Sequence, residues 1–176
     1  MLSEKRLRAV LHEAPLVSFQ GSVTRFVYEA FRYGAMPLGA LKNGARYNPR
    51  GAAALYASFS RACALAEFTR YIPDERRMSA ASMLSIDVRL NRALDLTDDA
   101  ILRLLRTSKD ELCSSRFPGD QHPASLLGFH AAKAGIDGLI VWSAVHDEEK
   151  NLVVFPDSHT TPPYVVVRSV RENAPP

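Results

Sequence analysis

The chain has 176 residues, 47% of them hydrophobic, so it can bury one sizeable core and falls within the size range of a single domain. Its formal net charge of +3 is too small to indicate a nucleic-acid-binding protein by itself. No apolar run approaches the roughly 18 residues of a membrane span, and charges occupy the N-terminal stretch where a signal peptide is apolar. We therefore expect a cytoplasmic protein without membrane contact.

Two cysteines, Cys63 and Cys113, lie far apart in the sequence, without a CxxC pair or a neighbouring group of histidines. This spacing indicates neither a disulfide framework nor a zinc site. We expect two reduced thiols and no bound metal. The five histidines show no metal-ligand spacing, and neither a GxSxG motif nor a phosphate-binding GxxxxGK[ST] loop occurs.

The first predicted element is a short accessory helix over residues 1–14, with Leu7 and Leu11 on its apolar stripe and Pro15 at its end. Residues 22–30 alternate weakly and contain β-branched and aromatic side chains, which predicts a strand. Residues 32–48 are rich in Gly, Pro and Asn, which predicts a long loop. Long loops inside compact domains are usually functional.

An apolar run at residues 53–58 predicts a buried strand, and Ser60 is suited to be the N-cap of a helix that ends near Tyr71. Residues 83–88 and 93–96 are expected to form two further strands.

Residues 98–105 predict a helix, because acidic residues occupy the first turn and arginines follow towards the end. Residues 107–122 have no clear period and are expected to form a loop. Residues 123–134 predict a further helix, with proline in its first turn and Gly135 just beyond its end.

Three strand-like runs follow, at residues 138–145, 151–155 and 164–170, and the first two are expected to form a hairpin. Strands and helices do not alternate regularly along the chain. The order predicts a single α+β domain with a mixed, mostly antiparallel sheet and flanking helices.

Two stretches resemble the RES domain family. Residues 44–67, GARYNPRGAAALYASFSRACALAE, bring glycine, Arg46, an aromatic residue, Asn and Pro ahead of a tyrosine-containing strand and a helix that carries Glu67. Residues 134–155, AGIDGLIVWSAVHDEEKNLVVF, are similar to the family's second block, where a glycine-containing turn leads into a strand with a serine and a turn with Asn leads into the next strand. An upstream strand arginine, Arg25, completes the pattern.

The resemblance implies a RES domain over residues 15–176 with a fold like that of ADP-ribosyltransferases. It implies that NAD is a substrate and not a cofactor, and that the nicotinamide–ribose bond is cleaved with phosphate or water as acceptor. It also implies a toxin that is paired with a cognate Xre-type antitoxin. Any contact with nucleic acid would then be made by the antitoxin and not by this chain.

Glu67 is the carboxylate expected to steady the oxocarbenium-like charge that develops on the ribose as nicotinamide leaves. Its alternative is a solvated glutamate on a helix surface. The resemblance implies a catalytic role for Ser143 also, in the run VWSAV. A buried hydroxyl needs a hydrogen-bond partner, which a neighbouring backbone group could equally supply.

Arg25 and Arg46 are the expected ligands of the two phosphates of NAD, because a guanidinium meets phosphate oxygens through a planar fork. Arg46 is also counted among the catalytic residues, Arg50 is expected to assist, and Arg32 competes for the role. The alternative makes Arg46 an anchor of its loop and Arg25 a surface residue on an edge strand.

Tyr47 and Tyr56 are expected to offer ring faces to nicotinamide or adenine. Both could equally be ordinary core or loop aromatics.

Two other functions compete with NAD degradation. A protein ADP-ribosyltransferase needs the same NAD pocket and differs in what attacks the ribose. A non-enzymatic basic module that binds nucleic acid is the third reading, although the basic residues are scattered singly along the chain.

Overall fold

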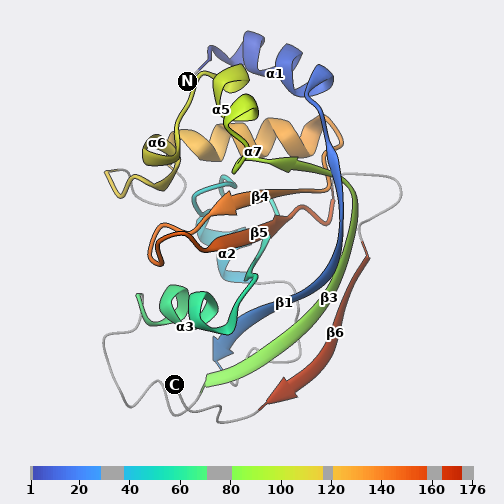
Figure 1. Ribbon diagram of the computed structural model, residues 1–176, viewed down its shortest axis with the longest axis vertical. Helices are drawn as coiled ribbons and strands as arrows, with labels where there is room; N and C mark the ends of the chain where they lie inside the picture. The colour runs from blue at the N-terminus through green and yellow to red at the C-terminus, as the bar shows by residue number, and fades with distance from the viewer. Residues whose placement is uncertain (1, 29–37, 71–80, 117–120, 158–163, 172–176) are drawn as a thin grey trace.

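The computed structural model describes residues 2–28, 38–70, 81–116, 121–157 and 164–171. Figure 1 shows the arrangement of the helices and strands. The helices are α1 (Glu4–Glu13), α2 (Leu38–Asn43), α3 (Arg61–Thr69), α5 (Asp99–Leu105), α6 (Lys109–Cys113) and α7 (Pro123–Lys133). The strands are β1 (Val17–Tyr28), β2 (Leu55–Ser58), β3 (Ala81–Asp95), β4 (Gly138–Trp142), β5 (Lys150–Val154) and β6 (Tyr164–Arg171).

The strands form one sheet in the order β1-β2-β5-β4-β3-β6, with β1 pairing with β3 as well. The long strand β3 pairs antiparallel with β1 and with β6, and the short strand β5 pairs antiparallel with β2 and with β4. Among the described strands, β3 with β4 is the parallel pair. The predicted α+β class, the mostly antiparallel sheet and the hairpin of β4 and β5 are confirmed.

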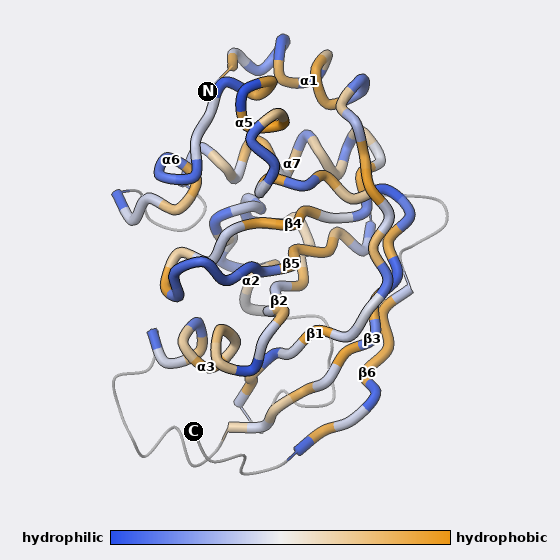
Figure 2. The backbone as a smooth tube through the Cα atoms, in the orientation of Figure 1, coloured by the Kyte–Doolittle hydropathy of each residue, from blue (hydrophilic) through white to orange (hydrophobic). Residues whose placement is uncertain are grey.

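Two apolar cores lie on opposite faces of the short strands. One core joins α1, α5 and α7 to β4 and β5, and includes Leu7, Leu127 and Val153. The other lies between the short strands and the long ones, and includes Leu152 and Val154. Successive residues of β5 thus enter different cores, because side chains alternate across a strand. Figure 2 shows high hydropathy along β4 and the end of β5, and low hydropathy in the turn between them.

The predicted helix boundaries follow from local hydrogen bonds and backbone angles. The Ser60 hydroxyl accepts from Cys63 N at 3.1 Å and caps α3. Pro123 opens α7, and Gly135 follows that helix with a φ of 76°, a left-handed angle that glycine adopts without strain. The predicted end of α3 near Tyr71 lies outside the described residues.

Several sequence predictions were wrong in detail, among them the start of β1, which lies at Val17 and not at residue 22. The expected strands 83–88 and 93–96 are one continuous strand, β3, whose pairing with β1 runs through the polar residues between them. The alternation of buried and exposed residues is interrupted at Asn91 and Arg92, where the pairing with β1 shifts its register. The predicted loop 107–122 contains α6, whose N-cap Ser108 accepts from Glu111 N at 3.2 Å. The predicted loop 32–48 contains α2, and its residues 32–37 are not described.

The N-terminal helix α1 packs against α7 and α5. Its residues Leu7 and Leu11 are fully buried in the helical core, as the apolar stripe predicts. Of the helices that the structure describes, none is long and apolar enough to cross a membrane.

Candidate active site

Glu67 lies near the end of α3 and is half-buried, in contrast to a solvated surface glutamate. Its Oε1 accepts a hydrogen bond from Ser143 Oγ at 2.8 Å and another from Asn151 Nδ2 at 2.6 Å. The three side chains come from segments that are distant in sequence. The carboxylate is therefore held by the tertiary fold and not by its own helix.

Ser143 immediately follows β4, which ends at Trp142 and not at residue 145 as the sequence predicts. The hydroxyl of Ser143 accepts from the backbone N–H groups of Val145 and His146, at 3.2 and 3.1 Å, while it donates to Glu67. The neighbouring backbone thus supplies hydrogen bonds, as one alternative expected, and the hydroxyl also donates to Glu67. Its oxygen is fixed by the turn, and its hydrogen is directed to the carboxylate.

Asn151 completes the group around Glu67. Its Oδ1 accepts from Ser58 Oγ at 2.6 Å and from Cys63 Sγ at 3.3 Å. Ser58 and Asn151 are direct partners in the pairing of β2 with β5, which brings their side chains together. Cys63 lies one turn before Glu67 on α3, so both residues face the same asparagine.

Arg46 lies in the loop between α2 and β2. Its Nη1 donates to the carbonyl oxygens of Leu112 and Ser114, at 2.8 and 2.6 Å. The same nitrogen lies 3.1 Å from Nε2 of His122, the N-cap residue of α7. Arg46 thus anchors its loop to the end of α6, which is the structural role that one alternative from the sequence expected.

Tyr47 and Tyr56 stabilise this loop. The hydroxyl of Tyr56 accepts from Tyr47 N at 3.0 Å and donates to Asn48 Oδ1 at 2.7 Å. Asn48 is buried, and its amide donates to Ala40 O and Ala52 O, both at 2.9 Å. The hydroxyl of Tyr56 therefore has a structural task, whatever its ring contacts.

The Tyr47 phenol is close to several groups of the site. Burial raises the pKa of Tyr47, Cys113 and Glu67 contribute in the same direction, and Arg46 opposes them. The phenol is therefore neutral at physiological pH.

Helix α7 packs directly against the backbone of the loop at Tyr47. A Cβ on Gly128 of α7 would lie 1.9 Å from Tyr47 O, so this position has no room for a side chain.

Arg25 lies on β1, where the strand pairs with β3 and, one residue earlier, with β2. The alternative placed Arg25 on an edge strand, but β1 has a neighbouring strand on each side at this point. Its guanidinium donates to the carbonyl oxygen of Tyr56. Burial lowers the pKa of Arg25 to about 10, with Tyr56 opposing, so the side chain stays cationic at neutral pH.

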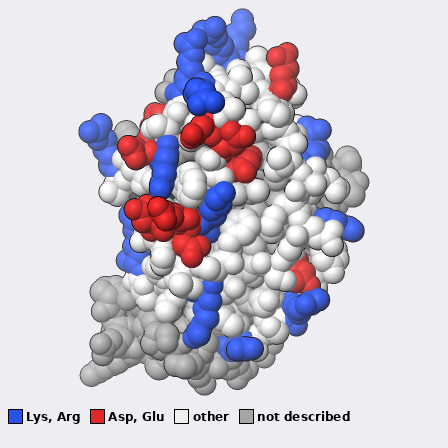
Figure 3. Space-filling model, viewed as in Figure 1, with Lys and Arg blue, Asp and Glu red and all other residues white. Residues whose placement is uncertain are grey.

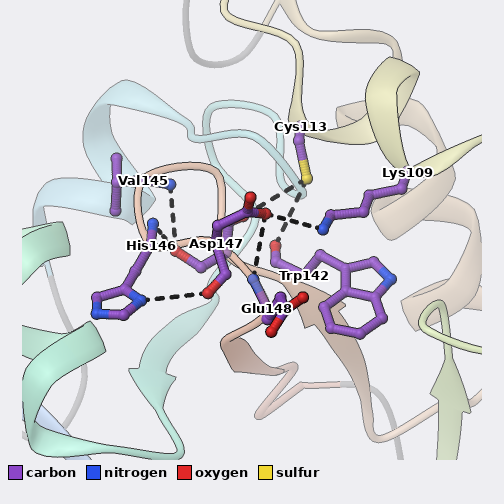
Figure 4. A network of polar contacts seen from close by, with 8 residues as sticks. Lys109, Cys113, Trp142, Val145, His146, Asp147 and Glu148 are labelled. Atoms are coloured by element: carbon purple, nitrogen blue, oxygen red, sulfur yellow. Dashed lines mark hydrogen bonds and ion pairs between the residues drawn. The ribbon is translucent and has the colours of Figure 1, made fainter.

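Helix α6 contacts the turn that carries Ser143. Lys109 Nζ lies 3.1 Å from Asp147 Oδ1 and 4.7 Å from the ring centre of Trp142, and Lys150 Nζ lies 5.0 Å from that centre. Figure 4 shows the ammonium of Lys109 pointing to the Asp147 carboxylate, close to Trp142. Because the other end of α6 accepts from Arg46, this helix connects the two halves of the site.

The predicted residues therefore fall into two groups. Glu67 and Ser143 are bonded directly, whereas Arg46, Tyr47, Tyr56 and Arg25 are joined through the loop and the backbone of β2. Within the described ranges, no hydrogen bond or ion pair joins Glu67 to an arginine. Arg50 is exposed, and Arg32 lies outside the described residues.

Sequence reasoning missed Ser58 and His122, and it gave no role to Asn48 and Asn151, although both belong to the stretches that resemble the family. The pairing of Ser58 with Asn151 could have been found by aligning the two strands that contain them. In the part of the chain that the structure describes, no group of three or more His, Cys, Asp or Glu residues could hold a metal ion.

Charges of both signs share the face seen in Figure 3. Acidic side chains gather over α5, α6 and the turn between β4 and β5, with lysines and arginines between and around them. The exposed acids include Asp98, Asp99, Asp110, Asp147 and Glu148. This face offers no continuous basic patch to a nucleic acid.

The fold and the site define an α+β domain whose carboxylate is held between a helix, a strand and a strand-connecting turn. The RES domain family profile matches residues 18–174, and the chain belongs to this family. A chain in the crystal structure of the M. tuberculosis MbcT–MbcA toxin–antitoxin complex has a similar fold. The TM-score is 0.80 at 20% identity, over 96% of this chain and 92% of that chain. A search of curated proteins finds no match.

Proposed function

We propose that this protein cleaves the nicotinamide–ribose bond of NAD, with phosphate or water as acceptor, and that it acts as a toxin. Membership of the RES domain family supports the proposal. The observation that carries it is the carboxylate of Glu67, which Ser143 and Asn151 hold through a single oxygen.

The reaction needs a fixed negative charge near the ribose. When the bond between C1′ and the nicotinamide nitrogen breaks, its electron pair leaves with neutral nicotinamide, and positive charge develops on the sugar. A carboxylate that accepts hydrogen bonds from the ribose hydroxyls stabilises this state more than the ground state. Because Glu67 is held in place before substrate binds, little reorganisation is needed when the bond breaks.

The second bond forms between C1′ and an oxygen of the acceptor. Phosphate yields a phosphorylated ADP-ribose, whereas water loses a proton and yields ADP-ribose. Arg25 and Arg46 are the groups that we assign to the two phosphates of NAD, since a guanidinium matches the geometry of phosphate oxygens. Arg25 contacts the backbone of β2 at Tyr56, and Arg46 lies in the loop next to Tyr47. The rings of Tyr47 and Tyr56 are assigned to the flat bases.

The test is release of nicotinamide from NAD by the wild type and by Glu67→Gln. The variant keeps the shape and removes the charge, and we expect its kcat to fall by about 100-fold or more. Glu13→Gln, an exposed residue on α1 with the same change, is the matched control and retains activity. Equal rates for the wild type and Glu67→Gln would refute the assignment.

Analysis of the products identifies the acceptor. With phosphate present, a phosphorylated sugar product indicates a phosphorylase, and free ADP-ribose indicates a glycohydrolase. ADP-ribose attached to protein, with little free product, would instead favour a protein ADP-ribosyltransferase. Unchanged NAD together with binding that weakens steeply with salt would favour the nucleic-acid-binding alternative.

A toxin of this kind needs a partner that restrains it. We propose a cognate antitoxin of the Xre type, and the similar fold of a chain from a toxin–antitoxin complex supports this.

A further inference from the structure

We propose that Asn151 is the positioning residue of the reactive carboxylate: its amide reserves Oε1 of Glu67 for contacts within the protein and leaves Oε2 for the substrate. The inference rests on the proposed function, because it assigns a task to a neighbour of the carboxylate on which that function depends.

The direction of the Asn151 amide follows from its neighbours. An ionised carboxylate only accepts hydrogen bonds, so the atom that lies 2.6 Å from Glu67 Oε1 is the NH₂ group. The amide oxygen then faces Ser58 Oγ and Cys63 Sγ, and both of these groups can donate to it. The reversed amide would set its oxygen against the carboxylate oxygen. The local network thus specifies a single orientation.

The two oxygens of Glu67 are used differently. Oε1 accepts from Ser143 and from Asn151, whereas none of the hydrogen bonds among the described residues reaches Oε2. Two donors from separate segments on one oxygen prevent the carboxylate from turning about its terminal bond. Without Asn151, Ser143 would be the single remaining hydrogen-bond partner and the direction of Oε2 would be poorly defined.

Asn151→Asp is the sharpest variant, because it preserves the shape and the acceptor for Ser58 but replaces the donor with a second carboxylate. Two carboxylates at this separation share one proton over a wider pH range. We expect kcat for nicotinamide release at pH 7 to fall about tenfold while KM for NAD stays within about threefold. The acid limb of the pH–activity profile moves up by roughly one pH unit. Asn91→Asp, an exposed residue on β3, is the matched control.

If Asn151 had a purely structural role, Asn151→Asp would lower the temperature of unfolding but would not move the acid limb of the pH–activity profile. If the wild type is active and Asn151→Asp has the same kcat and the same acid limb, the inference is overturned. Should that variant fail to fold, Ser58→Ala takes its place, since it removes one of the donors that orient the amide. Its kcat is expected to fall about threefold, and an unchanged kcat would overturn the inference.

An activity-free measurement separates this inference from the proposed function. The carboxyl carbon of Glu67 can be titrated by ¹³C NMR in the wild type and in Asn151→Asp without NAD. A higher midpoint in the variant supports the contact, and equal midpoints overturn it. A wild type that releases no nicotinamide refutes the proposed function and leaves this comparison intact.

Discussion

Two asparagines connect chain segments on either side of the site. Asn48 links the loop to α2 and to Tyr56, and Asn151 links β2 and α3 to Glu67. Neither could be assigned this task from the sequence, because asparagine in a Gly-rich loop or next to a charged turn is also what an ordinary turn requires. The family pattern pointed to Glu67 and Ser143, and the structure brings these two side chains into hydrogen-bond contact.

His122 combines a structural task with a titratable ring. Its Nδ1 accepts from Ala124 N at 3.1 Å and caps α7. Burial lowers the pKa of His122 below its usual 6.5, and Arg46 lowers it further. The folded protein thus favours the neutral ring, which alone can accept at Nδ1.

The pH dependence of stability follows from this depressed pKa. As pH falls below 6.5, the unfolded chain takes up a proton at His122 before the folded protein does. The contribution of His122 to stability is therefore complete above the unfolded pKa and is lost as pH falls through the folded pKa. We expect the free energy of unfolding, measured in urea, to decline more steeply from pH 7.5 to 5 for the wild type than for His122→Asn, which keeps a capping side chain. Parallel curves would contradict this expectation.

At the scale of elements, the sequence analysis mainly failed to predict the short helices α2 and α6, which lie in segments that were expected to be loops. Five residues of α6 are too few to show a period, although Ser108 and Glu111 have the spacing of a capping box, which could have revealed its start. β3 was divided at its middle because Arg89, Asn91 and Arg92 are polar. Arg89 and Asn91 are exposed and alternate with the buried Val88 and Leu90, whereas the exposed Arg92 lies where the pairing with β1 shifts its register, and the strand continues through it.

A substitution in α1 can test whether residues 1–14 are an accessory element or part of the domain. Leu11 is fully buried against the helical core, so Leu11→Ala is expected to lower the free energy of unfolding by about 3 kcal/mol. Leu104→Ala on α5 is the control, because Leu104 is 43% exposed. Denaturant unfolding measures both. A loss below about 1 kcal/mol for Leu11→Ala would show that α1 adds little to the domain.

At the scale of the whole molecule, the class and the hairpin could be predicted from periodicity, but the two cores could not. The run LVVF is apolar throughout, which indicates a buried strand without saying what covers each face. The structure places β5 between the helical core and the long strands. Pairings such as β3 with β4 join distant segments, which local patterns do not encode.

The proposed toxic role predicts an effect on growth. Expression of the wild type is expected to arrest bacterial growth and deplete cellular NAD, whereas Glu67→Gln at equal protein level does neither. Co-expression with the product of the adjacent open reading frame is expected to restore growth. Arrest that persists at full strength under co-expression would remove the support for that partner as an antitoxin.

The distances along the chain between Glu67 and its two holders also set an order of events during synthesis. The ribosome adds Ser143 76 residues after Glu67, and Asn151 84 residues after it. A nascent chain that ends shortly after Glu67 lacks both hydrogen-bond donors, so the carboxylate acquires its fixed position only after at least 84 further residues have been synthesised.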